Sequence, residues 1–174
     1  VSDSPFPVNP AGFNIHSAVH EVREDAQCVL HTHTAAGVAV SAQEQGLLPL
    51  SQQSLFALAS MSYHDYEGVA LNEDEKTRLQ ADLGDASFMI LRNHGLLVAG
   101  ESIADAFLFN FVLQRACEIQ VMAQSGGTPM VNIPDPILKG IKAQASQVTK
   151  GLGGHLAWPG LLRKLERIDP SFKD

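Results

Sequence analysis

The stretch Phe88-Met-Ile-Leu-Arg-Asn-His-Gly-Leu-Leu-Val-Ala99 decides the fold class of this chain. It holds two short apolar runs on either side of a polar turn, a pattern typical of two buried strands that follow each other directly. Strands joined by so short a turn pair antiparallel, because a parallel pairing needs a much longer crossover. The stretch therefore predicts a hairpin within a partly antiparallel sheet.

Extended and helical patterns alternate on both sides of this hairpin. Upstream, Cys28-Val-Leu-His-Thr-His33 predicts a strand, because an apolar run ends there in polar side chains. Serine residues at positions 54 and 102 are expected to cap helices. Helices are expected over residues 13–22, 35–44, 54–61, 72–83, 102–123, 135–150 and 158–165. Interleaved strands and helices indicate the α/β class.

The composition fits one globular domain of 174 residues, with 45% hydrophobic and 18% charged residues. A net charge of −7 argues against a partner such as nucleic acid or an anionic membrane surface. The sequence shows no signal peptide and no apolar run of membrane-spanning length, so we expect a cytoplasmic protein. Cys28 and Cys117 lie in apolar stretches and are expected to be buried free thiols.

Three histidines form the strongest candidate for a functional site. His31 and His33 are two residues apart on a predicted strand, so their side chains point to the same face and can reach one ion. His94 lies where another apolar strand runs into a glycine turn. Three histidines with one open position are a usual arrangement for catalytic zinc, although manganese or cobalt could also be held. The alternative is that these histidines are surface or hydrogen-bonded residues that bind no metal.

The remaining histidines carry weaker signals. His16 and His20 are one turn apart on the first predicted helix; such a pair can bind metal, but we favour a pocket-lining or capping role. His64 fits a pocket and an exposed loop equally well, and His155 is expected to be solvated. The sequence contains no phosphate-binding loop and no dinucleotide fingerprint, so nucleotide binding is unsupported.

The chain resembles a known family through several blocks that occur in order along the sequence. They are Gly12-Phe-Asn-Ile-His-Ser-Ala-Val-His20, Leu30-His-Thr-His-Thr34, Gly46-Leu-Leu-Pro-Leu-Ser51, Tyr63-His-Asp-Tyr-Glu-Gly68 and Leu91-Arg-Asn-His-Gly-Leu96. These blocks are similar to those of the class II aldolase/adducin family, and most similar to its bacterial adducin-related members. The resemblance implies a three-layer α/β/α fold with a central, largely antiparallel sheet.

The resemblance also implies a function. The family's metal ligands, usually for zinc, fall on His31, His33 and His94, where the metal acts as a Lewis acid. The implied activity is a metal-dependent aldolase-like lyase, or a related epimerase or decarboxylase, acting on a small carbonyl or sugar-type substrate. Candidates for the general base are water, a metal-bound hydroxide, His16, Tyr63 or a residue of a neighbouring subunit. Family members are commonly homo-oligomers, often tetramers.

The sequence departs from the family pattern in two places. The catalytic glutamate of family aldolases falls on Gly12, four residues before His16, and glycine has no side chain. A non-catalytic, adducin-like oligomerisation or interaction domain is therefore the alternative function. The resemblance also implies that the N-terminal part of the domain, ahead of Val1, is lacking. We expect residues 1–174 to form a single domain in which residues 125–174 are a C-terminal extension.

Overall fold

A four-stranded mixed sheet forms the centre of the protein. The computed structural model describes residues 5–70, 73–149 and 152–173. The strands are β1 (Cys28–Thr32), β2 (Met61–His64), β3 (Phe88–Leu91) and β4 (Gly95–Gly100), in the spatial order β1-β4-β3-β2. β4 pairs antiparallel with β1 and with β3, and β2 pairs parallel with β3. The predicted hairpin of β3 and β4 is confirmed, and two of the three pairings are antiparallel.

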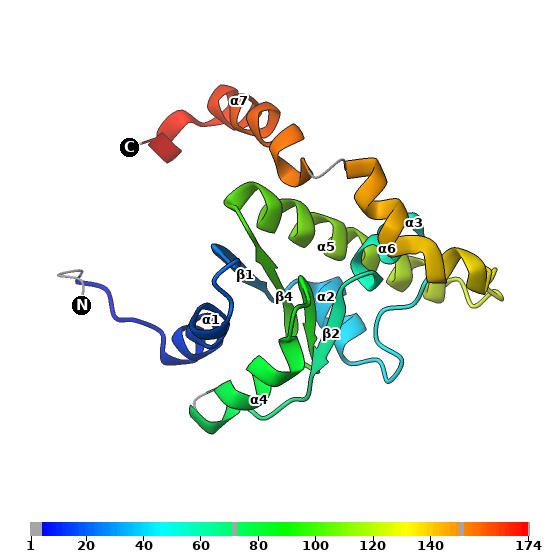
Figure 1. Cartoon of the computed structure of the whole chain (residues 1–174), viewed down its shortest axis with the longest axis horizontal. Coiled ribbons are helices and arrows are strands. Elements are labelled where there is room, and N and C mark those ends of the chain that lie inside the picture. Colours follow the sequence, from blue (N-terminus) through cyan, green and yellow to red (C-terminus); the bar gives the residue numbers. More distant parts are fainter. Residues whose placement is uncertain (1–4, 71–72, 150–151, 174) are drawn as a thin grey trace.

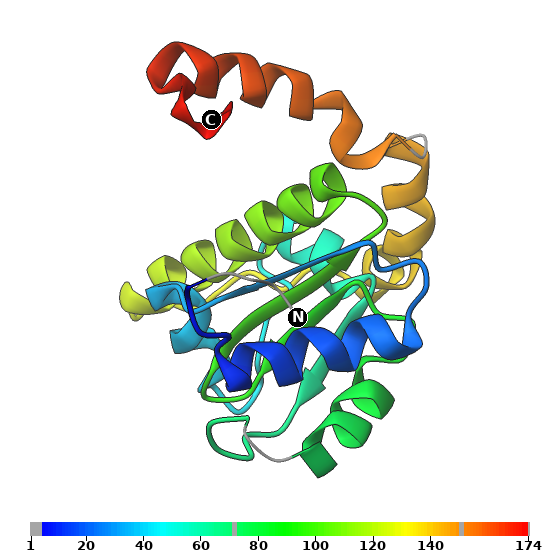
Figure 2. The same ribbon diagram turned by 90° about the vertical axis from the view of Figure 1, so that its left-hand side faces the viewer.

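Helices cover both faces of this sheet and give the three layers (Figure 1). On one face lie α1 (Pro10–Val22) and α4 (Glu73–Leu83), and on the other lie α2 (Ala35–Ser41), α3 (Gln52–Leu58) and α5 (Ile103–Ser125). Side chains alternate along β4, so Leu97 faces the α1–α4 side while Leu96 and Val98 face α5. Each face thus has its own apolar core, and Figure 2 shows α1 running across the first of them.

Short polar side chains set where several helices begin. Ser102 accepts a hydrogen bond from the Asp105 N–H, as the predicted cap of α5 should. The expected cap at Ser54 is wrong by one turn: Ser51 is the N-cap of α3, and Ser54 returns a hydrogen bond to it in a capping box. Residues 72 and 150, expected at helix ends, lie outside the described ranges.

β2 is the element that the sequence patterns did not predict. It is four residues long, and its side chains point to alternate faces of the sheet: Tyr63 lies on the α5 side and His64 is buried on the α4 side. Its parallel pairing with β3 joins residues that are more than twenty positions apart, Met61 with Phe88 and His64 with Leu91. A short strand defined by distant partners leaves little local pattern to read.

A C-terminal arm follows the sheet. It comprises α6 (Asp135–Thr149), the 3-10 turn η1 (Gly153–Leu156), α7 (Trp158–Ile168) and the 3-10 turn η2 (Pro170–Lys173). η1 is seated on α5, where the Gly154 N–H donates to Asp105 Oδ1 at 2.8 Å. In both views α7 stands away from the sheet (Figures 1 and 2). Among the described residues, no helix is long and apolar enough to span a bilayer.

Candidate metal centre

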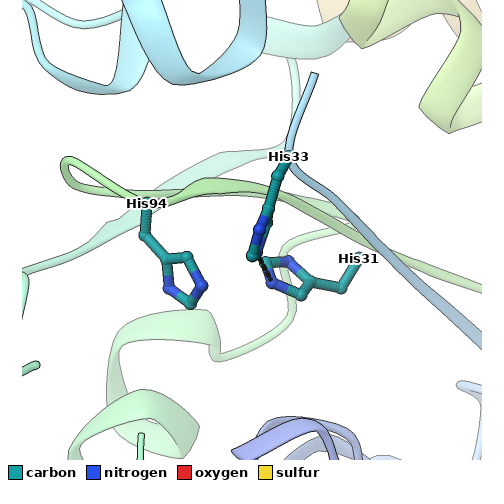
Figure 3. A group of neighbouring side chains, drawn as sticks. All are labelled: His31, His33 and His94. Atoms are coloured by element: carbon teal, nitrogen blue, oxygen red, sulfur yellow. Dashed lines mark hydrogen bonds between the residues drawn. The ribbon is translucent and has the colours of Figure 1, made fainter. Parts of the chain in front are cut away.

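The structure brings together the three histidines that the sequence singled out. His31 lies on β1, His33 directly follows that strand, and His94 lies in the β3–β4 turn. Each ring offers one nitrogen, and these nitrogens lie within 4.8 Å of one another. The ring centroids are 4.6 to 4.8 Å apart, and Figure 3 shows the imidazoles converging on one point. Within the described residues, this is the only group of three such side chains close enough to share an ion.

Backbone packing explains why the rings can converge. His31 is opposite Leu97 in the β1–β4 ladder, so it projects to the α1–α4 side of the sheet. Gly95 begins β4 directly after His94, and a Cβ there would lie 2.5 Å from the Thr32 carbonyl oxygen and 3.0 Å from the His33 ring. Any larger residue would push β1 away from the turn. The glycine that follows the third histidine is therefore required for this close approach.

The turn that carries His94 is held by hydrogen bonds to three elements. The Arg92 N–H donates to the His64 carbonyl of β2 at 2.8 Å, and the Asn93 N–H donates to the Ser41 carbonyl of α2 at 3.2 Å. The His94 N–H donates to Leu91 O at 3.1 Å. Asn93 has φ of 54°, a left-handed conformation that asparagine tolerates better than most residues. The turn is thus fixed before any ligand binds.

The surroundings of His31 and His94 favour their neutral imidazoles. His31 Nδ1 donates to the Leu96 carbonyl at 2.9 Å, which leaves its Nε2 as an acceptor for His33 Nε2 at 2.7 Å. Burial, together with the neighbouring His94 and His33, lowers the pKa of His31 to about 4. Burial and His33 also lower the pKa of His94. A neutral ring with a free lone pair is the form that binds a metal, so the donor set fits a divalent cation.

The two candidates for a general base lie in different places. His16 is half-buried on α1, on the side of the sheet that His31 faces; burial and His20 lower its pKa. Tyr63 lies on the opposite face, where its hydroxyl accepts a hydrogen bond from the Leu47 N–H at 3.1 Å. The Arg92 guanidinium lies 4.3 Å from the centre of the Tyr63 ring. Tyr63 therefore has a packing role here, whereas His16 remains beside the cluster.

Gly12 occupies the first turn of α1, one turn before His16. A Cβ at this position would meet nothing closer than Asn9 at 3.9 Å. The position therefore has room for a side chain, and no steric demand of the fold explains the glycine.

A buried polar cluster near the histidines carries no sequence signal of its own. His64 Nδ1 contacts Asp82 Oδ2 at 2.7 Å, and His64 Nε2 lies 3.5 Å from Glu75 Oε1. His64 and Glu75 are buried, and they come from β2 and α4. Of the other histidines, His20 and His155 are exposed, as expected for His155. Only the pairing of β2 with the sheet brings His64 under α4, which no local pattern reveals.

The architecture is that of the class II aldolases. The structure matches an aldolase II superfamily protein from Pseudomonas syringae with a TM-score of 0.91 and 46% identity, covering 99% of this chain and 69% of that chain. It also matches L-fuculose 1-phosphate aldolase from Glaciozyma antarctica PI12 with a TM-score of 0.74 and 27% identity, covering 94% of this chain and 61% of that chain. The predicted α/β, class II aldolase-like fold is confirmed.

The chain belongs to the class II aldolase/adducin family, because the family model "Class II Aldolase and Adducin N-terminal domain" matches residues 1–121. A Pseudomonas aeruginosa protein named "Putative aldolase class 2 protein" is 65% identical over 174 residues, which are 98% of this chain and 67% of that protein. Mouse alpha-adducin is 42% identical over 173 residues, covering 92% of this chain and 23% of the adducin. The predicted resemblance is therefore confirmed, and the family typically uses a divalent metal.

Proposed function

We propose that this chain is a metal-dependent aldolase-like lyase, or a related epimerase or decarboxylase, acting on a small carbonyl or sugar-type substrate. The observation that carries the proposal is the convergence of His31, His33 and His94, whose ring nitrogens lie within 4.8 Å of one another. Bringing three half-exposed imidazoles to one point removes part of the hydration of each ring. This cost is unfavourable unless a ligand compensates for it. The similarity to L-fuculose 1-phosphate aldolase supports the substrate class.

The three histidines would hold one divalent cation, with Zn²⁺ as our first choice and Mn²⁺ or Co²⁺ as alternatives. When bound, such a cation polarises the carbonyl of a substrate. The protein's own contribution is positional: Leu96 O fixes the ring of His31, and the hairpin turn fixes His94. His16 or a water would move the proton, because Gly12 supplies no carboxylate.

We further propose that residues 1–174 form one domain with 125–174 as its C-terminal extension, and that the protein is a cytoplasmic homo-oligomer, with a tetramer as the expected form. The membership in the family supports the oligomer. The net charge of −7 supports a small-molecule substrate over nucleic acid or membrane lipid.

One observation favours a second candidate function, a non-catalytic adducin-like oligomerisation or interaction domain. The position of the family's catalytic glutamate is Gly12, and the fold there would accept a side chain. Similarity to mouse alpha-adducin at 42% identity agrees with that alternative. It predicts no turnover of any carbonyl substrate, and self-association that a chelator leaves unchanged.

The first experiment is elemental analysis of protein purified without an affinity tag, with His33→Ala beside the wild type. We expect about one zinc, manganese or cobalt per wild-type chain. The variant should lose that metal, because two histidines leave the ion with too few protein ligands. His155→Ala is the matched control, since His155 is exposed and distant in sequence, and it should keep the metal.

Retention of metal then justifies screening hydroxy-aldehydes, hydroxy-ketones and keto acids for turnover that His31→Ala abolishes. Metal in wild type together with no turnover across that panel would favour the adducin-like candidate. No metal in either protein would contradict the proposal at its first step.

A further inference from the structure

A small cavity lies between the candidate metal centre and α4. Its free volume is about 10 Å³, which is room for one water molecule. His94 lines one part of it, and His64 and Glu75 line another. Ile15, Leu79 and Leu91 supply its apolar lining, and the segment 65–68 together with Arg92 completes the wall. The cavity therefore joins one of the three histidines to the buried polar cluster.

Among the residues that the structure describes, two buried polar atoms of this cluster have no hydrogen-bond partner, namely His64 Nε2 and Glu75 Oε2. Their residues are 3% and 7% exposed, so bulk water does not reach them. An unpaired buried polar atom destabilises the folded state, and native folds rarely retain two side by side. Since both residues line the same cavity, one water placed there can satisfy both atoms.

The ring of His94 lies beside the same cavity. Its ring contacts are with His31, His33 and Tyr66, and within the described residues neither of its ring nitrogens makes a hydrogen bond to protein. A histidine that binds a metal through one nitrogen almost always donates its other N–H to a carboxylate, a carbonyl or a water. His31 already does so through Leu96 O. His94 needs an equivalent partner, and the cavity lies beside it.

We propose that a single water fills this cavity, accepts a hydrogen bond from the His94 ring and donates one to Glu75, so that Glu75 positions His94 as a metal ligand. This inference rests on the metal centre of the proposed function. The contact of His64 Nδ1 with Asp82 Oδ2 at 2.7 Å orients the His64 ring, and its Nε2 lies 3.5 Å from Glu75 Oε1 without a hydrogen bond. The same water can donate its second proton to His64 Nε2 and so join β2 to the carboxylate. Glu75 is a positioning residue, because it reaches the metal centre only through the water and His94.

A purely structural role of Glu75, in which it only ties α4 to β2, makes a different prediction. That role would lower the stability of a Glu75 variant and leave its metal affinity unchanged. Loss of a carboxylate that orients a ligand through hydrogen bonds typically costs 10- to 100-fold in metal affinity. Metal affinity measured on folded protein therefore separates the two roles.

The experiment measures the Kd for Zn²⁺ by competition with a chromophoric chelator, and the absorption spectrum with Co²⁺. Glu75→Leu removes the acceptor and should weaken Zn²⁺ binding by about tenfold and alter the Co²⁺ bands. Glu75→Gln keeps an acceptor oxygen and should recover most of the affinity. Glu73→Gln is the control, because it removes the same charge from an exposed position in the first turn of the same helix. Circular dichroism confirms that each variant is folded.

Equal Zn²⁺ affinity in wild type, Glu75→Leu and Glu73→Gln would overturn this inference and leave the proposed metal centre standing. Absence of Zn²⁺ binding in the wild type would overturn both. If Glu75→Leu does not fold, a crystal structure of the wild type that resolves ordered waters decides. A water within hydrogen-bonding distance of His94 and Glu75 supports the inference, and a dry cavity refutes it.

Discussion

Helices α5 and α7 show opposite relations between pattern and burial. The apolar residues of α5 are distributed around most of the helix circumference, and its buried positions include Leu113, Ala116 and Cys117. The apolar residues of α7 are confined to one stripe, which contains Trp158, Leu161, Leu165 and Ile168, yet none of its side chains is buried. An amphipathic stripe shows which side of a helix would be stabilised by burial. Whether another element packs against that side depends on the fold.

The largest expected difference between the two helices is in the loss of stability when one leucine of each is replaced by alanine. Leu113 is fully buried, so Leu113→Ala leaves a cavity and should lower the free energy of unfolding by about 2–5 kcal/mol. Leu165 is 41% exposed, and Leu165→Ala should change stability by less than about 0.5 kcal/mol. Urea unfolding measures both. Comparable losses of stability in the two variants would contradict the contrast between the helices, because they would mean that the apolar stripe of α7 is buried against a partner in solution.

A second pair of variants tests how the arm is attached to α5. A Cβ on Gly154 would lie 1.9 Å from the Ala104 carbonyl oxygen, so Gly154→Ala must displace η1 and should cost about 1–3 kcal/mol. In α7, a Cβ on Gly160 meets nothing closer than Arg163 at 3.8 Å, so Gly160→Ala should be tolerated or slightly stabilising.

Limited trypsin digestion reads out the same pair, because α7 contains Arg163 and Lys164. Cleavage there should become faster in Gly154→Ala than in wild type and remain unchanged in Gly160→Ala. Equal digestion of all three proteins would indicate that η1 does not hold the arm.

The smallest expected effect on stability comes from a comparison of the reactivity of one thiol on each helix. Burial in α5 raises the pKa of Cys117 to about 12, so almost no thiolate forms at neutral pH. A thiol placed on α7 by Leu165→Cys, with Cys28→Ser to remove the other native thiol, should titrate normally. At pH 8 the introduced thiol should react with a disulfide reagent about a thousandfold faster than Cys117, as the two thiolate fractions imply.

The pH dependence sharpens this test. The rate for the introduced thiol should level off above its ordinary pKa, whereas the rate for Cys117 should keep rising as the pH approaches 12. Similar rates at pH 8 would show that α5 opens locally, and that the contrast between the two helices is smaller than the structure indicates.

Much of the fold and the convergence of the three histidines could be predicted because both depend on local alternation. The apolar runs of 88–99 define β3 and β4, and the two-residue spacing of His31 and His33 places both rings on one side of β1. His94 could be added because it ends a strand at a glycine, and Gly95 proves necessary for the approach of β1. These features need only a few neighbouring residues to be recognised.

The parts that could not be predicted depend on contacts between distant segments. β2 becomes a strand through its pairing with β3, and His64 becomes buried because α4 covers it. Glu75 is one of several acidic residues at the start of α4, and nothing in the sequence distinguishes it from Glu73 or Asp74. Only the packed structure turns it inward toward the cavity beside His94.

The turn that carries His94 has a kinetic consequence. The amide protons of Arg92, Asn93 and His94 are bonded to three different places, β2, α2 and the end of β3. An amide exchanges with deuterium only when its bond opens, and for Arg92 and Asn93 the opening requires β2 and α2, respectively, to part from the hairpin. These two amides should therefore exchange as slowly as those of the central strands. The segment that carries the third histidine is consequently expected to open together with the sheet and not as a mobile loop.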